Sequence, residues 1–263
     1  MNFQNKVNEL RKKDILNFKT NYFMNKINNN ALYLENDNAI ICLTQDRDIY
    51  RLYFAFINLF DFENILKQLP INIKISLEFI TKKEIDSDLY NCINKYLPFD
   101  TVFERFRCKV DKLKIFKKWE LNQIEYADIN DIEFILKTLE KTFNYYSSHL
   151  PTINQLKDLQ GNNNIIVVKN NNKTIASFLI IKPNSKSINF DQLVGLDKNP
   201  LNLMKVIDFL NIKLKKEGYN EIFLWIDVLY NKDVIKLHKL YGYKPDNTKD
   251  YYFINNLLRQ YKI

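Results

Sequence analysis

The chain has 263 residues, of which 46% are hydrophobic and 14% aromatic, and its formal net charge is +8. This length suits two ordinary domains, and this hydrophobic content excludes a disordered chain. No apolar run approaches the length of a membrane span, and the N-terminal sequence MNFQNKVNELRKKD lacks the apolar stretch of a signal peptide. We therefore expect a cytoplasmic protein with no membrane partner.

The positive charge is carried almost entirely by lysine, since only six of the 39 basic residues are arginine. Arginine binds phosphate in a bidentate manner more effectively than lysine does, so this composition does not favour a nucleic-acid partner. Lysine, asparagine and isoleucine are abundant while glycine and proline are scarce, a bias typical of an A/T-rich coding sequence. A solvated basic surface is the simpler interpretation.

The three cysteines, Cys42, Cys92 and Cys108, are far apart in the sequence and each lies in an apolar context. This pattern predicts buried, reduced thiols. No pair of Cys or His residues has the spacing of metal ligands, so no metal is expected.

The first half of the chain alternates strand-like and helix-like segments. In order, it predicts a helix over 1–30, strands at 31–34, 39–43 and 50–57, a helix over 61–69, a strand at 73–80, a helix over 84–97 and a strand over 101–110. Asp61 is the expected N-cap of the second helix, and Thr81 with Glu84 has the spacing of a capping box for the third. A Lys-rich connector at 111–118 follows and is the expected domain boundary.

The second half begins with a strand at 121–127, and Asp128 then caps a helix that reaches 143. After an aromatic loop at 144–151 come a helix over 152–159, a hairpin of 165–168 and 174–181, and a strand at 187–194. A loop leads to a helix over 201–217 ended by Gly218, then a strand at 222–228, a helix over 232–241 and a last strand at 251–254. Asparagines 170–172 are expected to supply the positive φ angles of the hairpin turn.

The stretch IFLWIDVLYNKDVIKLHKLYGY, residues 222–243, carries the most information. It combines a buried strand, an Asn-bearing loop, a short helix and a terminal Gly-aromatic pair. This pattern resembles the last crossover of the GNAT acetyltransferase superfamily. The matching positions are Asn231, Val234, Ile235, Leu237, His238, Gly242 and Tyr243.

The element order from about Leu121 to the C-terminus is also similar to that of GNAT enzymes, and the first half repeats its later part. The resemblance implies an α/β fold with two GNAT-like domains, each a mixed sheet flanked by helices. Residues 1–115 would form a truncated, degenerate copy and residues 116–263 a complete acetyltransferase-like domain.

The resemblance further implies acetyl-CoA or another acyl-CoA as co-substrate, bound where two parallel strands diverge. Leu193 and Val194 would offer main-chain groups to the pantetheine, and Asn231 would support it or simply cap the last helix. The glycine-rich loop of the family is missing here. Lys198, Asn199, Leu201 and Asn202 remain as candidates for the phosphates, with an ordinary helix start that binds nothing as the alternative.

Two side chains are candidates for proton transfer. His238 occupies the position where many GNAT enzymes have a Tyr that protonates the leaving thiolate, although it could be a half-buried helix residue. Tyr241 is a fallback donor or a core residue. Asp191 could take a proton from the acceptor ammonium, or it could face water. Tyr145, Tyr146 and His149 could form the rim of the acceptor pocket, unless His149 is merely exposed.

The resemblance thus implies an N-acetyltransferase that acts by direct transfer on an amine of a small molecule or sugar. An acyltransferase with a larger donor is a second enzyme hypothesis. A catalytically degenerate GNAT-like binding or assembly module is the alternative from another class. A homodimer is left open.

Overall fold

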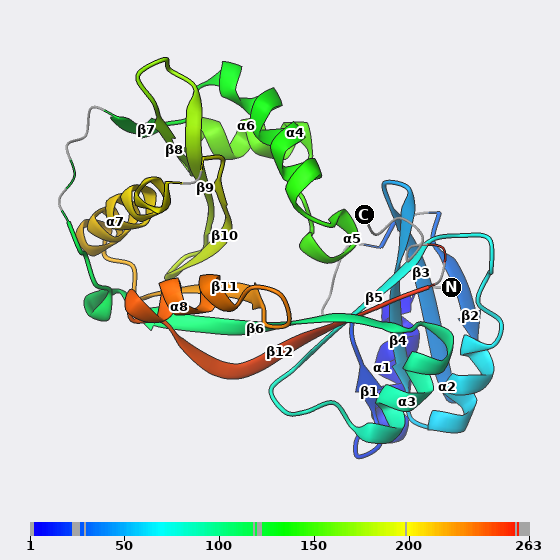
Figure 1. The fold of residues 1–263 in the computed structure, drawn as a ribbon. Helices are drawn as coiled ribbons and strands as arrows, with labels where there is room; N and C mark the ends of the chain where they lie inside the picture. The colour runs from blue at the N-terminus through cyan, green and yellow to red at the C-terminus, as the bar shows by residue number, and fades with distance from the viewer. Residues whose placement is uncertain are drawn as a thin grey trace. The chain divides into compact units, whose positions relative to one another are not determined.

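The computed structural model describes residues 3–22, 27–28, 30–117, 119, 123–197, 199–255 and 257. The chain divides into two compact units (Figure 1). Unit 1 takes in residues 1–102 and 248–263, and unit 2 takes in residues 103–247. The compact units are therefore bounded differently from the domains expected at 1–115 and 116–263, and each is described by itself below.

Both unit boundaries fall within strands, which explains the difference. β6 (Phe99–Lys109) starts in unit 1, but its residues 103–109 pair antiparallel with β11 (Glu221–Asp227) of unit 2. β12 (Lys244–Ile254) starts in unit 2, but its residues 249–254 pair antiparallel with β5 (Ile75–Thr81) of unit 1. The first half of the sequence thus supplies β6 to the sheet of unit 2, and the second half supplies β12 to the sheet of unit 1. Alternating apolar residues predict a strand, but they do not reveal which sheet it joins.

Unit 1 is a mixed sheet with helices. Its remaining elements are α1 (Phe3–Lys13), β1 (Lys19–Thr20), β2 (Leu32–Glu35), β3 (Ala39–Asp46), β4 (Ile49–Phe56), α2 (Leu59–Leu66) and α3 (Ser87–Tyr96). The strand order is β2-β3-β4-β5-β12, and only β4 and β5 are parallel. The strands predicted at 31–34, 39–43, 50–57 and 73–80 are confirmed to within a few residues.

Among the described residues, the predicted helix over 1–30 ends at Lys13. The Asp14 carboxylate accepts hydrogen bonds from the backbone N–H groups of Leu16 and Asn17 at 3.2 Å, which forms a turn in place of further helix. The α1 helix buries Phe3, Val7 and Leu10 against β3 and β4. Beyond the turn, residues 19–20 form β1.

Two predicted helix starts are also corrected. The N-cap of α2 is Asn58, whose side chain accepts from the Asp61 N–H, so Asp61 lies inside the first turn. The N-cap of α3 is Asp86, and Glu84 instead binds Lys249 and Tyr251 of β12. A long-range partner has therefore replaced the local capping box that the spacing predicted.

Unit 2 contains the remaining elements. They are η1 (Val110–Lys112), β7 (Ile124–Tyr126), η3 (Ile129–Asp131), α4 (Ile132–Thr142), α5 (Tyr145–Ser148), α6 (Ile153–Gly161), β8 (Ile165–Lys169), β9 (Ile175–Pro183), β10 (Ser187–Gly195), α7 (Pro200–Glu217) and α8 (Lys232–Leu240). The strand order is β6-β11-β10-β9-β8-β7, and only β10 and β11 are parallel. This agrees with the element order expected for the second half, and 121–122 lie outside the described residues.

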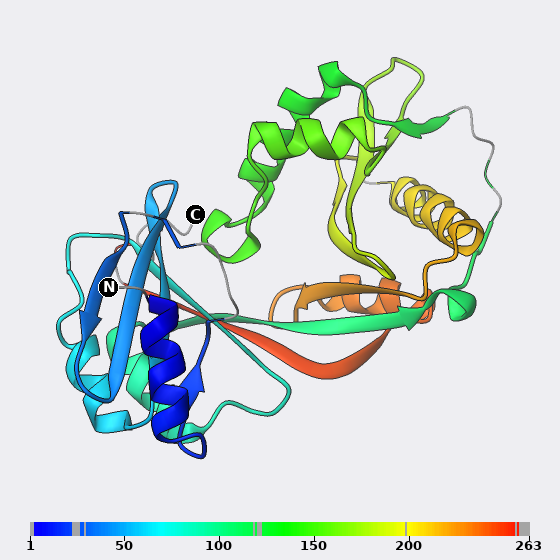
Figure 2. The ribbon, with the colours of Figure 1, turned by 180° about the vertical axis from the view of Figure 1, so that it is seen from behind.

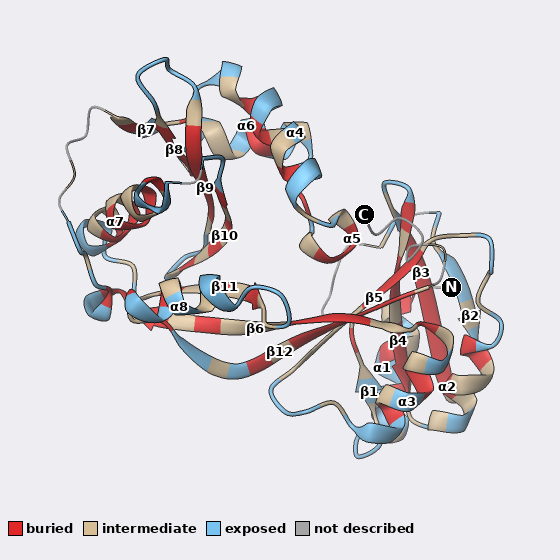
Figure 3. Ribbon diagram, viewed as in Figure 1, coloured by how far each residue is buried: buried red, intermediate tan, exposed pale blue. Residues whose placement is uncertain are grey.

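The core of unit 2 lies on both faces of its sheet. Ile165 and Val167 of β8 pack in one cluster with α4 and α6, while Ile166 and Val168 pack in another with α7. Strands buried on both faces are expected where helices cover each side, as Figure 3 shows for β8 and β9. Asp208 and Asn211 of α7 are fully buried and bind the connector, since Asp208 accepts from the N–H groups of Phe116 and Lys117 and from the Trp119 indole.

Two glycines end helices as predicted, with left-handed φ angles of 78° at Gly218 and 101° at Gly242. The positive φ in the β8–β9 turn is at Lys173 and not at an asparagine, because the Asn170 side chain instead accepts from the backbone N–H groups of Asn172 and Thr174. None of the helices in the described residues combines the length and apolar character needed to cross a lipid bilayer.

Candidate functional site

β10 and β11 are neighbours over only part of their length. Their parallel pairing runs from Ser187↔Glu221 to Asn189↔Phe223 and then stops. Beyond this point β10 stays with β9 and β11 stays with β6, and Figures 1 and 2 show β9 and β10 running away from β11. The facing backbone groups of 190–195 and 224–227 therefore have no strand partner across a wedge-shaped gap, and such groups can pair with an extended ligand.

A β-bulge marks the point of divergence. The register of β10 against β9 shifts between Phe190↔Ile181 and Gln192↔Ile180, which leaves Asp191 as the extra residue. A bulge bends its strand and redirects side chains. The bulge therefore places Asp191 at the mouth of the gap.

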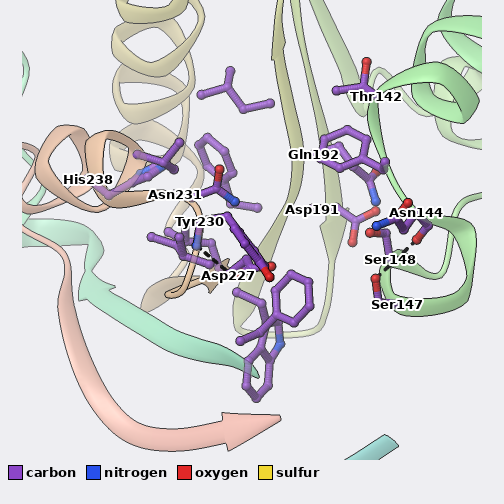
Figure 4. A pocket seen from close by; sticks show the side chains of 18 residues that line it. Thr142, Asn144, Ser147, Ser148, Asp191, Gln192, Asp227, Tyr230, Asn231 and His238 are labelled. Carbon is purple, nitrogen blue, oxygen red and sulfur yellow. Dashed lines mark hydrogen bonds between the residues drawn. The ribbon is translucent and has the colours of Figure 1, made fainter. Parts of the chain in front are cut away.

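A cavity of about 450 Å³ fills the gap (Figure 4). Two strands line it, through residues 190–193 of β10 and 224–227 of β11, together with Phe103 of β6. The rest of the lining comes from residues 142–144 and 147–148 around α4 and α5, from Tyr230 and Asn231 just before α8, and from Val234 and His238 in the first and last turns of α8. In Figure 4, Asp191 and Gln192 lie beside Asn144 and Ser148, whereas Asn231 and His238 lie on the opposite side.

Asp191, the expected base, lies in this cavity with its side chain only 13% exposed. Its carboxylate forms an ion pair with Lys182 of β9 at 2.7 Å and accepts from the Asn189 amide at 3.2 Å. Asp191 is therefore a positioned carboxylate and not a solvated surface charge.

His238, the expected acid, also lines the cavity but is only 1% exposed. Its ring makes edge contacts with Phe190 and Tyr243 at centroid distances of 5.1 and 5.2 Å, and its Nδ1 has no hydrogen-bond partner among the described residues. Burial lowers the pKa of His238 to about 4, because desolvation penalises the imidazolium. At neutral pH the ring is therefore uncharged, which does not favour the predicted role of His238 as a proton donor.

Tyr241 does not line the cavity. It is fully buried in the core of unit 2, where its ring packs against Phe116 at 5.0 Å and its hydroxyl lies 3.4 Å from the Met204 carbonyl oxygen. The fallback role as a donor is therefore not supported, and the core interpretation holds.

Asn231 sits at the N-cap position of α8, yet its side chain makes no capping hydrogen bond. The exposed amide instead lines the cavity, where it can bind a ligand. Gln192 was not predicted at all. It is 5% exposed, lines the same cavity, and its Oε1 has no partner among the described residues. Burial alternates along the whole of β10, and Gln192 falls on the buried positions together with Phe190 and Val194, so a polar residue at a position of apolar parity is the signal that could have identified it.

The segment expected at the acceptor rim does reach the cavity, but through residues other than those predicted. Tyr146 is 3% exposed and Tyr145 packs against it, while His149 has a left-handed φ of 43° and lines a separate cavity with Lys182. None of these three lines the gap. Asn144, Ser147 and Ser148 do, because the single turn of α5 places Ser147 and Ser148 next to Asn144.

The loop before α7 is a poor fit to a pyrophosphate, because protein groups occupy four of its described N–H donors. The Leu196 N–H binds the Ala176 carbonyl, the Asn199 N–H binds the Asp197 carboxylate, and the Leu201 N–H binds the Asn199 side chain. Pro200 has no N–H group, and the Asn202 N–H binds the Asn199 carbonyl. The Asp197 carboxylate therefore sits where an anion would be expected at a helix N-terminus.

The remaining expected cofactor residues are dispersed. Asn199 and Asn202 line a different cavity, of about 540 Å³, whose described cations Lys169 and Lys205 already bind protein groups. Leu201 is exposed and lines neither cavity, and Lys198 lies outside the described residues. Leu193 lines the gap. The Val194 side chain packs in the core with α4 and α6, so only its backbone can serve a ligand.

Unit 1 contains a second strand divergence that is filled by its own chain. β4 and β5 are paired only from Tyr50↔Ile75 to Leu52↔Leu77. Beyond that, β1 pairs with β4 at Ala55 and Phe56. The Asn21 amide donates to the Leu52 and Glu78 carbonyls at 2.9 Å, and its Oδ1 accepts from the Phe54 N–H at 2.7 Å. In the part of the chain that the structure describes, the open gap between parallel strands is therefore the one in unit 2.

The three cysteines are free and buried, as predicted. Among the described residues, no group of three or more His, Cys, Asp or Glu side chains could hold a metal ion.

No family model matches the sequence, and no curated protein matches it. A conserved protein of unknown function from Staphylococcus epidermidis ATCC 12228 is similar in structure, with a TM-score of 0.57 and 13% identity over 87% of this chain and 95% of that chain. A GCN5-related N-acetyltransferase from Sphaerobacter thermophilus has a TM-score of 0.57 and 9% identity over 83% and 76%. A tandem GNAT protein from the clavulanic acid biosynthesis pathway has a TM-score of 0.55 and 6% identity over 82% and 78%. At such identities the similarity establishes the fold.

Proposed function

We propose that this chain, which has the fold of the GNAT N-acetyltransferases, uses the gap in unit 2 to transfer an acyl group from a CoA thioester directly to an amine of a small molecule or sugar. The observation that carries the proposal is the divergence of β10 and β11, with the 13% exposed carboxylate of Asp191 at the bulge where the strands part. Fold alone does not establish function, so the argument rests on this site.

Three groups are proposed to hold the pantetheine arm of the donor. They are the backbone of Leu193 and Val194 on β10 and the uncommitted Asn231 amide. Unit 1 supports the assignment by analogy, since its own divergent strands bind an extended segment through the β1 backbone and the Asn21 amide. A pantetheine arm has the same extended form and amide groups.

The donor supplies a thioester carbonyl activated for attack. In the transfer, the amine nitrogen forms a bond to the carbonyl carbon, and the carbon–sulfur bond breaks with its electron pair going to sulfur. The acceptor begins as an ammonium and loses two protons, of which one ends on the thiol and one in solvent. Asp191 is the proposed base for the first proton, directly or through water.

His238 is proposed to line the cavity as an uncharged side chain and not to act as the acid. A thiol with an ordinary pKa near 8.5 needs little acid assistance to leave at neutral pH. The fixed arrangement of donor and acceptor would then supply much of the rate. Backbone N–H groups on the unpaired part of β10 are the proposed partners of the developing oxyanion.

The test is thiol release from acetyl-CoA in the presence of a panel of small amines and amino sugars. Asp191→Asn should lower kcat/KM by about 100-fold or more, the usual contribution of a general base. Glu140→Gln, on the exposed part of α4, is the matched control and should leave it unchanged. Absence of amine-dependent thiol release from the wild-type chain would refute the transferase proposal, and full activity of Asp191→Asn would refute the role of Asp191.

A binding or assembly module that no longer transfers acyl groups is the second candidate. The occupied N–H donors before α7 and the Asp197 carboxylate favour it, because they oppose a pyrophosphate. Thermal unfolding with increasing CoA separates the candidates, since a ligand of the folded state must raise the midpoint. No rise at millimolar CoA would favour the module.

A further inference from the structure

We infer that the gap in unit 2 selects an organic cation as acceptor: an amine with an apolar or aromatic body and without a carboxylate or phosphate group. This inference rests on the proposed function and specifies its substrate class. Three features of the cavity support it, namely the sign of its charges, its aromatic walls and an unpaired acceptor atom.

The charged groups that line the cavity are both negative. They are Asp191 on β10 and Asp227 at the end of β11, and none of the described lining residues is Lys or Arg. The nearby cations lie outside the lining, where Lys182 pairs with Asp191 and Arg105 pairs with Asp246, each at 2.8 Å or less. An anionic acceptor would therefore meet carboxylates with no free cation, whereas an ammonium would meet a favourable potential.

Aromatic side chains surround the carboxylates. The lining includes Phe103, Phe143, Phe190, Trp225 and Tyr230. Ring faces attract ammonium groups and also bury the apolar part of a ligand. The molecule already uses Trp225 in this way, since the Arg105 guanidinium lies 5.6 Å from the centre of its ring.

The unpaired buried atoms of the lining include His238 Nδ1 and the Gln192 side-chain oxygen, and the Gln192 oxygen calls for a donor. Gln192 Oε1 accepts no hydrogen bond from the described residues, and leaving a buried acceptor unpaired is costly. Asp227 already accepts hydrogen bonds from the N–H groups of Leu229 and Tyr230, so its carboxylate does not require a donor from a ligand. An ammonium or amine N–H can donate to Gln192 Oε1, whereas a carboxylate oxygen cannot.

The experiment compares three ligands that share one aromatic body: phenethylamine, phenylalanine and 3-phenylpropionate. Calorimetric titration of the full chain measures binding without turnover. We expect phenethylamine to bind at least about ten-fold more tightly than phenylalanine, and 3-phenylpropionate to bind most weakly. Equal affinity for phenylalanine, tightest binding of 3-phenylpropionate, or no binding of phenethylamine would each overturn the inference.

Variants link the preference to the cavity. Gln192→Leu should weaken phenethylamine binding at least about five-fold and narrow its advantage over phenylalanine, while Glu140→Gln should change neither value. Each variant must first retain the melting midpoint of the wild-type chain to within about 3 °C; if Gln192→Leu fails, the milder Gln192→Met is used in its place. Unchanged selectivity in a folded Gln192 variant would overturn the role of Gln192.

The same ligands separate this inference from the proposed function. If phenethylamine binds but no amine releases thiol from acetyl-CoA, the transferase proposal fails and the cation site stands. If thiol release is observed with anionic acceptors in preference to phenethylamine, the transferase proposal stands and the acceptor inference fails.

Discussion

Replacing Asn21 by alanine removes three hydrogen bonds that close the strand divergence in unit 1. The Asn21 side chain is 4% exposed and joins both strands, through the Leu52 carbonyl and Phe54 N–H of β4 and the Glu78 carbonyl of β5. Each bond contributes about 1 kcal/mol net, and buried partners left unpaired add to the loss. We therefore expect Asn21→Ala to lower the free energy of unfolding by about 3 kcal/mol.

Urea denaturation followed by circular dichroism measures this loss, and amide hydrogen exchange locates it. Exchange at the Phe54 amide should speed up most, because that N–H loses its acceptor. Asn5→Ala, at an exposed position of α1, is the matched control and should change stability by less than about 0.5 kcal/mol. A loss below that value for Asn21→Ala, or unchanged exchange at Phe54, would refute the reasoning.

Three further predictions concern charge. Burial and the neighbouring Glu78 raise the pKa of Asp250 well above its ordinary value of 3.8. Ionisation of Asp250 therefore opposes folding, and the free energy of unfolding falls as the pH rises above 3.8. Asp250→Asn should therefore raise the melting midpoint at pH 8 and have little effect near pH 4; an equal gain at both would contradict this. Because the pKa of His238 is held at about 4, the pH–rate profiles of the wild-type chain and of His238→Gln should have the same shape between pH 6 and 7. A step in turnover in this range that is lost in His238→Gln would contradict this. Asp197→Asn should tighten CoA binding about three-fold or more in a calorimetric titration, since it removes the negative charge before α7, and weaker binding would show that Asp197 helps to hold the donor.

Parts of the site were predictable because they depend on short segments. The spacing of Asn231, His238 and Gly242 placed a strand, a loop and a helix in the right order, and His238 and Asn231 do line the gap. The charge state of His238 was not predictable, since it depends on Phe190 and Tyr243, which come from other elements. For the loop at 144–151, the sequence indicated the segment that reaches the cavity but not the residues, because α5 buries Tyr146 and places Ser147 and Ser148 in the lining.

The sequence by itself determined the order and type of nearly all elements, because apolar periodicity, caps and glycines act within a few residues of one another. Only the tertiary structure decided where β6 and β12 pair, which of the two strand divergences stays open, and that β1 and Asn21 fill the other. Those outcomes depend on hydrogen bonds between residues far apart in the chain. Sequence patterns that span only a few residues do not show which distant segments pair.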